Sequence, residues 1–159
     1  MGLQALQLYQ RVAKRFGPEH RFQLDLWKFE ALGVPSLGRH AADEAAAADL
    51  LIIAANRDDR VPLDLRIWIE QWTDRKIGKE CVLVFLSERS SATTDGVAPM
   101  HAFLRDVARQ NLMTFLSDSL GTIGRVRNAF MEQIQERARQ SCFVREKAPL
   151  MNRSILAFH

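Results

Sequence analysis

The sequence predicts a single α/β domain built as a three-layer sandwich, with an open and mostly parallel sheet between layers of helices. Continuous apolar segments at 50–55 and 82–86 have the length and composition of strands that are covered on both faces. Amphipathic helical patterns alternate with these segments, which is typical of crossovers between parallel strands. A chain of 159 residues fits one domain and can bury roughly 70% of the surface that it exposes when unfolded.

The first half of the chain alternates helix and strand. Apolar residues at helical spacing predict a helix over residues 3–16, which the Gly17-Pro18 pair ends. Alternating apolar and polar residues predict a strand at 21–29, with a bulge or a change of face near its end. After a glycine- and proline-containing loop, an alanine-rich helix is expected at 39–48, because alanine is the best helix former.

The second half continues the alternation from the buried strand at 50–55. Pro62 suits the first turn of a helix, where its missing N–H is harmless, and this helix is expected to end near Gly78. The second buried strand, at 82–86, leads through a polar loop to a helix that Pro99 opens.

The last part of the chain completes the predicted domain. Residues 112–116 are expected to form the fourth strand and residues 123–138 a final amphipathic helix. Residues 1–140 then form the domain, and residues 141–159, which show no clear period, form a tail that packs on it or extends. The chain begins with a helix, whereas a sheet of this kind normally begins with a strand.

Composition and charge narrow the classes of function. Residues 121–159 carry a net charge of +4 (seven basic, three acidic) and the rest of the chain −1. The basic residues are dispersed among glutamates, which predicts a solvated helix face and no nucleic-acid interface. No apolar run approaches the ~20 residues that span a membrane, and no secretory signal is visible. Two cysteines make no disulfide framework, so a cytoplasmic protein is expected.

The strand at 50–55 belongs to a longer pattern. The pattern comprises Ala48-Asp49-Leu50-Leu51-Ile52-Ile53, then Val61-Pro62, then Arg66-Ile67-Trp68-Ile69-Glu70-Gln71-Trp72. It resembles the flavodoxin-like superfamily, and most of all its NAD(P)H-dependent FMN reductases. The resemblance covers about residues 3–140. It implies a flavodoxin-like open parallel sheet with helices on both faces, in which four strands are recognisable and the first strand is missing.

The missing strand has three explanations. In the flavodoxin order the first strand lies between the second and the third. Without it, the strand at 21–29 pairs directly with that at 50–55, another chain fills the gap, or the sequence is truncated upstream. The sequence leaves these explanations open.

The resemblance also implies an FMN site, from which this chain departs. The family's phosphate loop follows the missing strand, the loop beside the flavin ring is here the charged segment 56–60, and a glycine-rich loop is replaced by residues 87–94. Hydrogen bonds to a phosphate contribute about 1.5–3 kcal/mol each, so losing the phosphate cradle weakens binding by powers of ten. We therefore expect no cofactor, with FMN as the alternative.

Ligands of open α/β sheets bind at the carboxyl ends of the strands, where this chain carries small polar and charged residues. The candidates for holding a small anionic ligand are Asn56, Asp58, Ser87, Ser117, Thr122 and Arg125. The segment 117–125 offers hydroxyls, glycines and an arginine at the start of a helix, which suits an anion. Turn and helix-cap roles explain the same residue types. Asp58, Asp59 and Asp118 also suit a hard cation.

Catalytic and metal-binding patterns are missing from the sequence. The four histidines show no metal-ligand spacing with the cysteines, and there is no nucleophile elbow. We interpret Trp68 and Trp72 as core residues; the alternative is an exposed patch through which the chain forms a homodimer.

These observations favour a bacterial-type, degenerate flavodoxin-like domain with a binding or interaction role, and they leave open whether it is an enzyme. One alternative is an FMN-dependent NAD(P)H oxidoreductase whose first strand and phosphate loop are truncated. The other is a receiver-like signalling domain without a phosphoacceptor, because the strand that ends at Ala54-Ala55-Asn56 offers no aspartate at its end.

Overall fold

A computed structural model of the chain describes residues 2–16, 21–55, 60–76, 81–87, 99–119 and 152–159. In chain order the elements are α1 (Gly2–Phe16), β1 (Arg21–Trp27), α2 (Phe29–Leu32), α3 (Pro35–Ala47), β2 (Leu50–Ala54), α4 (Leu63–Thr73), the 3-10 helix η1 (Asp74–Lys76), β3 (Val82–Ser87), α5 (Pro99–Gln110), β4 (Thr114–Ser119) and β5 (Asn152–Phe158).

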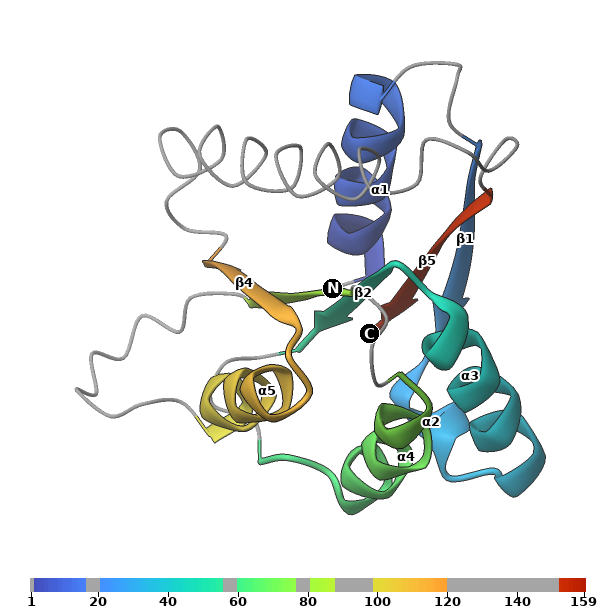
Figure 1. Cartoon of the computed structure of the whole chain (residues 1–159), viewed down its shortest axis with the longest axis vertical. Helices are drawn as coiled ribbons and strands as arrows, with labels where there is room; N and C mark the ends of the chain where they lie inside the picture. The colour runs from blue at the N-terminus through green and yellow to red at the C-terminus, as the bar shows by residue number, and fades with distance from the viewer. Residues whose placement is uncertain (1, 17–20, 56–59, 77–80, 88–98, 120–151) are drawn as a thin grey trace.

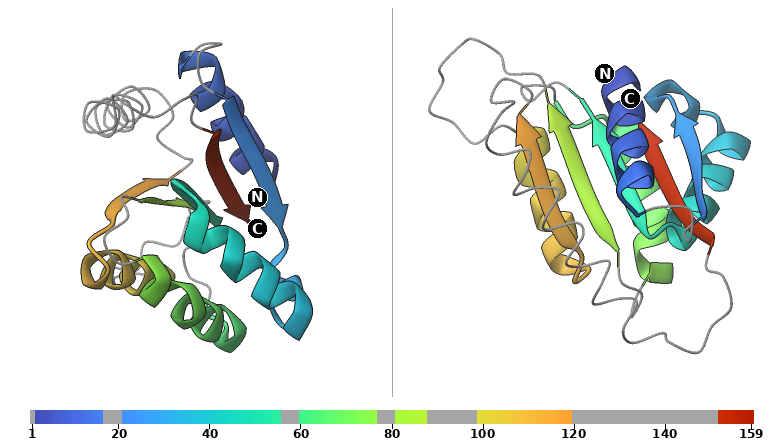
Figure 2. Two further views of the ribbon diagram at one scale, coloured as in Figure 1. Left: turned by 45° about the vertical axis from the view of Figure 1, so that its right-hand side comes forward. Right: turned by 90° about the horizontal axis from the view of Figure 1, so that it is seen from above.

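The described strands form one parallel sheet in the order β1-β5-β2-β3-β4. Helices α3, α4 and α5 cover one face, and α1 lies on the other, so the fold has three layers (Figures 1 and 2). The continuous apolar sequence of β2 is buried at each of its positions, as expected for a strand covered on both sides. The predicted α/β class and open parallel sheet are therefore confirmed.

The internal position of β5, between β1 and β2, corrects the prediction of a four-strand sheet that lacks its first strand. Residues 152–158 were expected to belong to a tail, and they lie between β1 and β2. Ile155 pairs in register with Leu24 on one side and with Leu50 on the other. Residues 155–158 are four consecutive apolar residues. A run of this length can form a buried strand, but it is too short for its periodicity to distinguish a strand from a buried helix segment. The predicted gap in the sheet therefore does not exist, because β5 of the same chain occupies that position.

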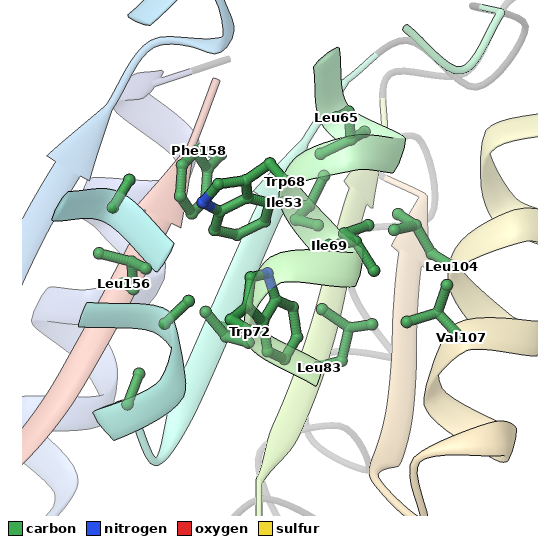
Figure 3. Close-up of a cluster of buried hydrophobic side chains, with 14 of the residues drawn as sticks. Ile53, Leu65, Trp68, Ile69, Trp72, Leu83, Leu104, Val107, Leu156 and Phe158 are labelled. Carbon is green, nitrogen blue, oxygen red and sulfur yellow. The ribbon is translucent and has the colours of Figure 1, made fainter. Parts of the chain in front are cut away.

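Two apolar clusters hold the helices on the sheet. The larger cluster lies beneath α3, α4 and α5 and includes Trp68 and Trp72, which are 1% and 0% exposed. Figure 3 shows the ring of Trp68 against Phe158 of β5, with ring centroids 4.4 Å apart. The smaller cluster joins α1 to the opposite face through Ala5 and Leu8. Both tryptophans are core residues, so the alternative of a tryptophan-based dimerisation patch is wrong.

Several element boundaries differ from the predicted ones. Helix α3 begins at Pro35 and contains Gly38, where a Cβ atom would lie 2.8 Å from the carbonyl oxygen of Leu32. The glycine therefore serves close packing in a helix and marks no loop. Strand β4 begins two residues later than expected, because Leu112 takes a left-handed conformation (φ 55°) that closes the turn after α5. The helix expected at 123–138 lies outside the described residues.

Candidate functional site

Because the five described strands are parallel, their carboxyl ends lie at one edge of the sheet. The helices that adjoin β5 and β2 at this edge lie on opposite faces of the sheet. α1 starts beside the end of β5 on one face, and α4, which follows β2, packs on the other face. A point where helices leave a parallel sheet in opposite directions is where open α/β folds bind ligands. The carboxyl edge at β5 and β2 is therefore the candidate site.

His159 closes the end of β5 and touches the first residue of α1. Its N–H donates to the carbonyl of Trp27 (3.1 Å), and its own carbonyl accepts from the N–H of Phe29 (3.2 Å). Its ring lies over Gly2, where a Cβ atom would come within 2.8 Å of the ring. The two ends of the chain thus meet at this edge (Figures 1 and 2).

The start of α1 gives this edge a positive field. The N–H groups of a first helical turn point away from the helix and carry about half a positive charge together. The first turn of α1 contains no acidic residue, whereas the first turn of α4 contains Asp64. The field of α1 is thus not cancelled from within its own first turn, which favours an anion near Gly2 and His159.

A second group of polar side chains lies farther along the same edge, at β3 and β4. Ser87 is buried at the end of β3 and pairs in register with Ser119. Ser117 is exposed, and its Oγ lies 3.2 Å from Nε2 of His101 in the first turn of α5. The hydroxyl and the imidazole are within hydrogen-bond distance.

The structure places two of the predicted binding residues at the predicted edge. Ser87 and Ser117 lie on adjacent strands, although Ser87 is buried and only Ser117 is open to solvent. Four other candidates lie outside the described residues: Asn56, Asp58, Thr122 and Arg125. The cation alternative also depends on residues 58 and 59, which lie outside them too.

Sequence reasoning missed both histidines of this edge. His101 stands two residues after Pro99, so its place in the first turn of a helix that follows a strand was a usable signal. His159 gave no such signal, because residues 155–158 were not interpreted as a strand.

The opposite, amino edge of the sheet carries a different polar group, formed by Lys76 and Cys81. Lys76 is 3% exposed, and its Nζ donates to the carbonyl of Ala45 (2.6 Å) and to that of Ala48, at the end of α3. Burial raises the pKa of the Cys81 thiol to about 11, and the nearby Lys76 lowers it only in part. Cys81 is therefore a protonated core thiol near neutral pH.

Within the described part of the chain, no helix is both long and apolar enough to cross a membrane. The same residues contain no group of three or more His, Cys, Asp and Glu side chains placed to hold a metal ion. No protein-family model, curated protein or solved structure matches this chain.

Proposed function

We propose that this chain is a flavodoxin-like domain that binds a small anionic ligand at the carboxyl edge of its sheet and has no intact flavin site. The position of β5 is the observation that supports this most. With β5 between β1 and β2, the strand order corresponds to the flavodoxin order 2-1-3-4-5 in which the first strand stands last in the chain. In that order the ligand crevice lies between the strands that are here β5 and β2.

The start of α1 at this crevice supports an anion as the ligand. The positive end of α1 meets the crevice at Gly2, and no acidic residue in its first turn opposes an anion there. The imidazole of His159 adds a group that can donate a hydrogen bond to an anion beside the same turn. A reducing, cytoplasmic location fits this proposal, since Cys81 is a buried free thiol.

The proposal excludes tight FMN binding because of the loops around the crevice. The segment after β2, which in the resembling family lies beside the flavin ring, consists here of the charged residues 57–60 and offers the ring no apolar surface. The FMN-dependent alternative relied on a first strand from outside residues 1–159. β5 already occupies that place in the sheet, so this reason for the alternative is lost.

Substitution of Leu3, which is 67% exposed in the first turn of α1, tests the anion site. In Leu3→Glu a carboxylate interacts favourably with the helix N-terminus by about 0.3–1 kcal/mol, so the thermal midpoint rises. The same charge repels an anion, so the dissociation constant for inorganic phosphate rises roughly two- to fivefold. Leu3→Gln is the matched control, since it has a similar shape and no charge.

Phosphate binding is measured by titration followed through backbone amide resonances. We expect shifts at Gly2–Gln4 and at His159, with little change in the first turn of α4. Unchanged resonances at α1, or equal affinity of both Leu3 variants, contradict the anion site. Flavin is tested separately by the visible absorbance of the purified protein and by FMN titration. A stoichiometric bound flavin overturns the claim that the flavin site is not intact.

A further inference from the structure

The hydrogen-bonded pair of His101 and Ser117 has a chemistry that the anion site does not use. His101 lies in the first turn of α5, and Ser117 lies on β4, at the end of the described sheet. The Nε2–Oγ distance of 3.2 Å lies at the outer limit of the range in which a base and a nucleophile work together. Because Ser117 is exposed, a molecule from solvent can reach its hydroxyl.

The histidine ring is held in place by aromatic neighbours. Its centroid lies 5.3 Å from the ring of Phe115 in an edge-to-face arrangement and 6.1 Å from the ring of Phe85. Phe115 and Ser117 are two residues apart on one strand, so both point to the face that α5 covers. This packing restricts the imidazole and keeps Nε2 directed at the hydroxyl. In the tautomer that carries its proton on Nδ1, Nε2 accepts from Ser117.

We propose that Ser117 and His101 form a nucleophile–base pair that accepts an acyl group from a small activated ester. This proposal goes beyond the anion-binding role and does not depend on it. Nε2 takes the hydroxyl proton while Oγ forms a bond to the carbonyl carbon, and the bond from that carbon to the leaving oxygen breaks. The leaving oxygen departs as an anion, so the imidazolium releases its Nε2 proton to solvent and becomes a base again. Water then attacks the acyl-serine, Nε2 takes a proton from the water, and Oγ leaves with a proton returned from Nε2.

The surroundings of the pair point to a small acyl group with a stable leaving group. The partly buried ring of Phe115 provides an apolar neighbour on the side of the histidine, and the buried ring of Phe85 supports the imidazole from within the core. The first turn of α5, which carries His101, has N–H groups without intrahelical carbonyl partners, and such groups can stabilise an oxyanion that forms beside them. A phenolate leaves without needing a proton, so one nucleophile and one base suffice for such an ester.

The test is the reaction of the full chain with p-nitrophenyl acetate. We expect a stoichiometric burst of p-nitrophenolate and an acetyl group that peptide mass spectrometry locates on Ser117. Ser117→Ala abolishes the burst, and Ser117→Cys retains acylation because the thiol replaces the hydroxyl. His101→Gln, which can still contact the hydroxyl but cannot act as a base, lowers the burst rate about 100-fold.

Exposed residues outside the pair provide matched controls, namely Ser36→Ala and His40→Gln, which leave the burst unchanged. Circular dichroism and the thermal midpoint show that each variant is folded. A full burst in Ser117→Ala, an acetyl group on another side chain, or an unchanged rate in His101→Gln overturns the proposal. The phosphate titration at α1 is run on Ser117→Ala as well, so that failure of the acyl site and failure of the anion site are seen separately.

Discussion

The two edges of the sheet use polar residues in opposite ways. At the amino edge, Lys76 is buried and donates to backbone carbonyls at the end of α3, beside the protonated thiol of Cys81. At the carboxyl edge, Ser117 is exposed to solvent, and His159 is only partly covered. Polar groups that are buried and paired stabilise the fold, whereas reachable ones can bind or react. The comparison predicts that the amino edge stabilises the fold, and both proposed sites lie at the carboxyl edge.

The largest expected effect tests whether the carboxyl edge rests on a fully packed strand. Phe158→Ala is expected to lower the free energy of unfolding by about 3–5 kcal/mol, because the ring is fully buried against Trp68 and its loss leaves a cavity. Denaturant unfolding measures this, with Leu26→Ala as the control. Leu26 is 46% exposed on the neighbouring strand β1, so its truncation costs far less. Equal costs would mean that residues 152–158 do not form a buried strand between β1 and β2.

The next effect compares the two edges directly. Lys76→Met removes the charged donor from the carbonyls of Ala45 and Ala48, and such bonds contribute about 1.5–3 kcal/mol each. We expect a loss of about 3 kcal/mol in the free energy of unfolding, partly offset by the apolar methionine. Ser117→Ala at the carboxyl edge changes the same quantity by about 0.5 kcal/mol or less. A larger loss of stability in Ser117→Ala than in Lys76→Met would contradict the view that the amino edge is the stabilising one.

The smallest effect concerns pH and the Cys81 thiol. Burial raises its pKa from 9.0 to about 11, so above pH 9 the unfolded chain loses this proton while the folded chain keeps it. The free energy of unfolding therefore falls as the pH rises from 9 to 11, by at most about 2–3 kcal/mol from this group. Cys81→Ala removes this part of the decline, although other groups still titrate. Parallel stability curves for the two proteins would show that the thiol is not buried in this way.

Periodicity and composition were sufficient to predict most of the described helices and strands. The strands at β2 and β3 were predictable because an apolar run flanked by polar loops is buried wherever it lies in the sheet. The helices α1, α4 and α5 were predictable because one face of each is apolar. For the candidate site, Ser87 and Ser117 were predictable as residues near the ends of buried strands.

The sequence by itself determined the fold class, since the apolar positions of each segment specify which of its faces is buried. Only the tertiary structure decided that the last strand of the chain lies inside the sheet, between β1 and β2, and that His101 reaches Ser117. Both depend on partners distant in the sequence: Ile155 pairs with Leu24 and Leu50, and His101 lies 16 residues from its serine. Such pairings arise when packing closes around the chain, and no local pattern of residues specifies them.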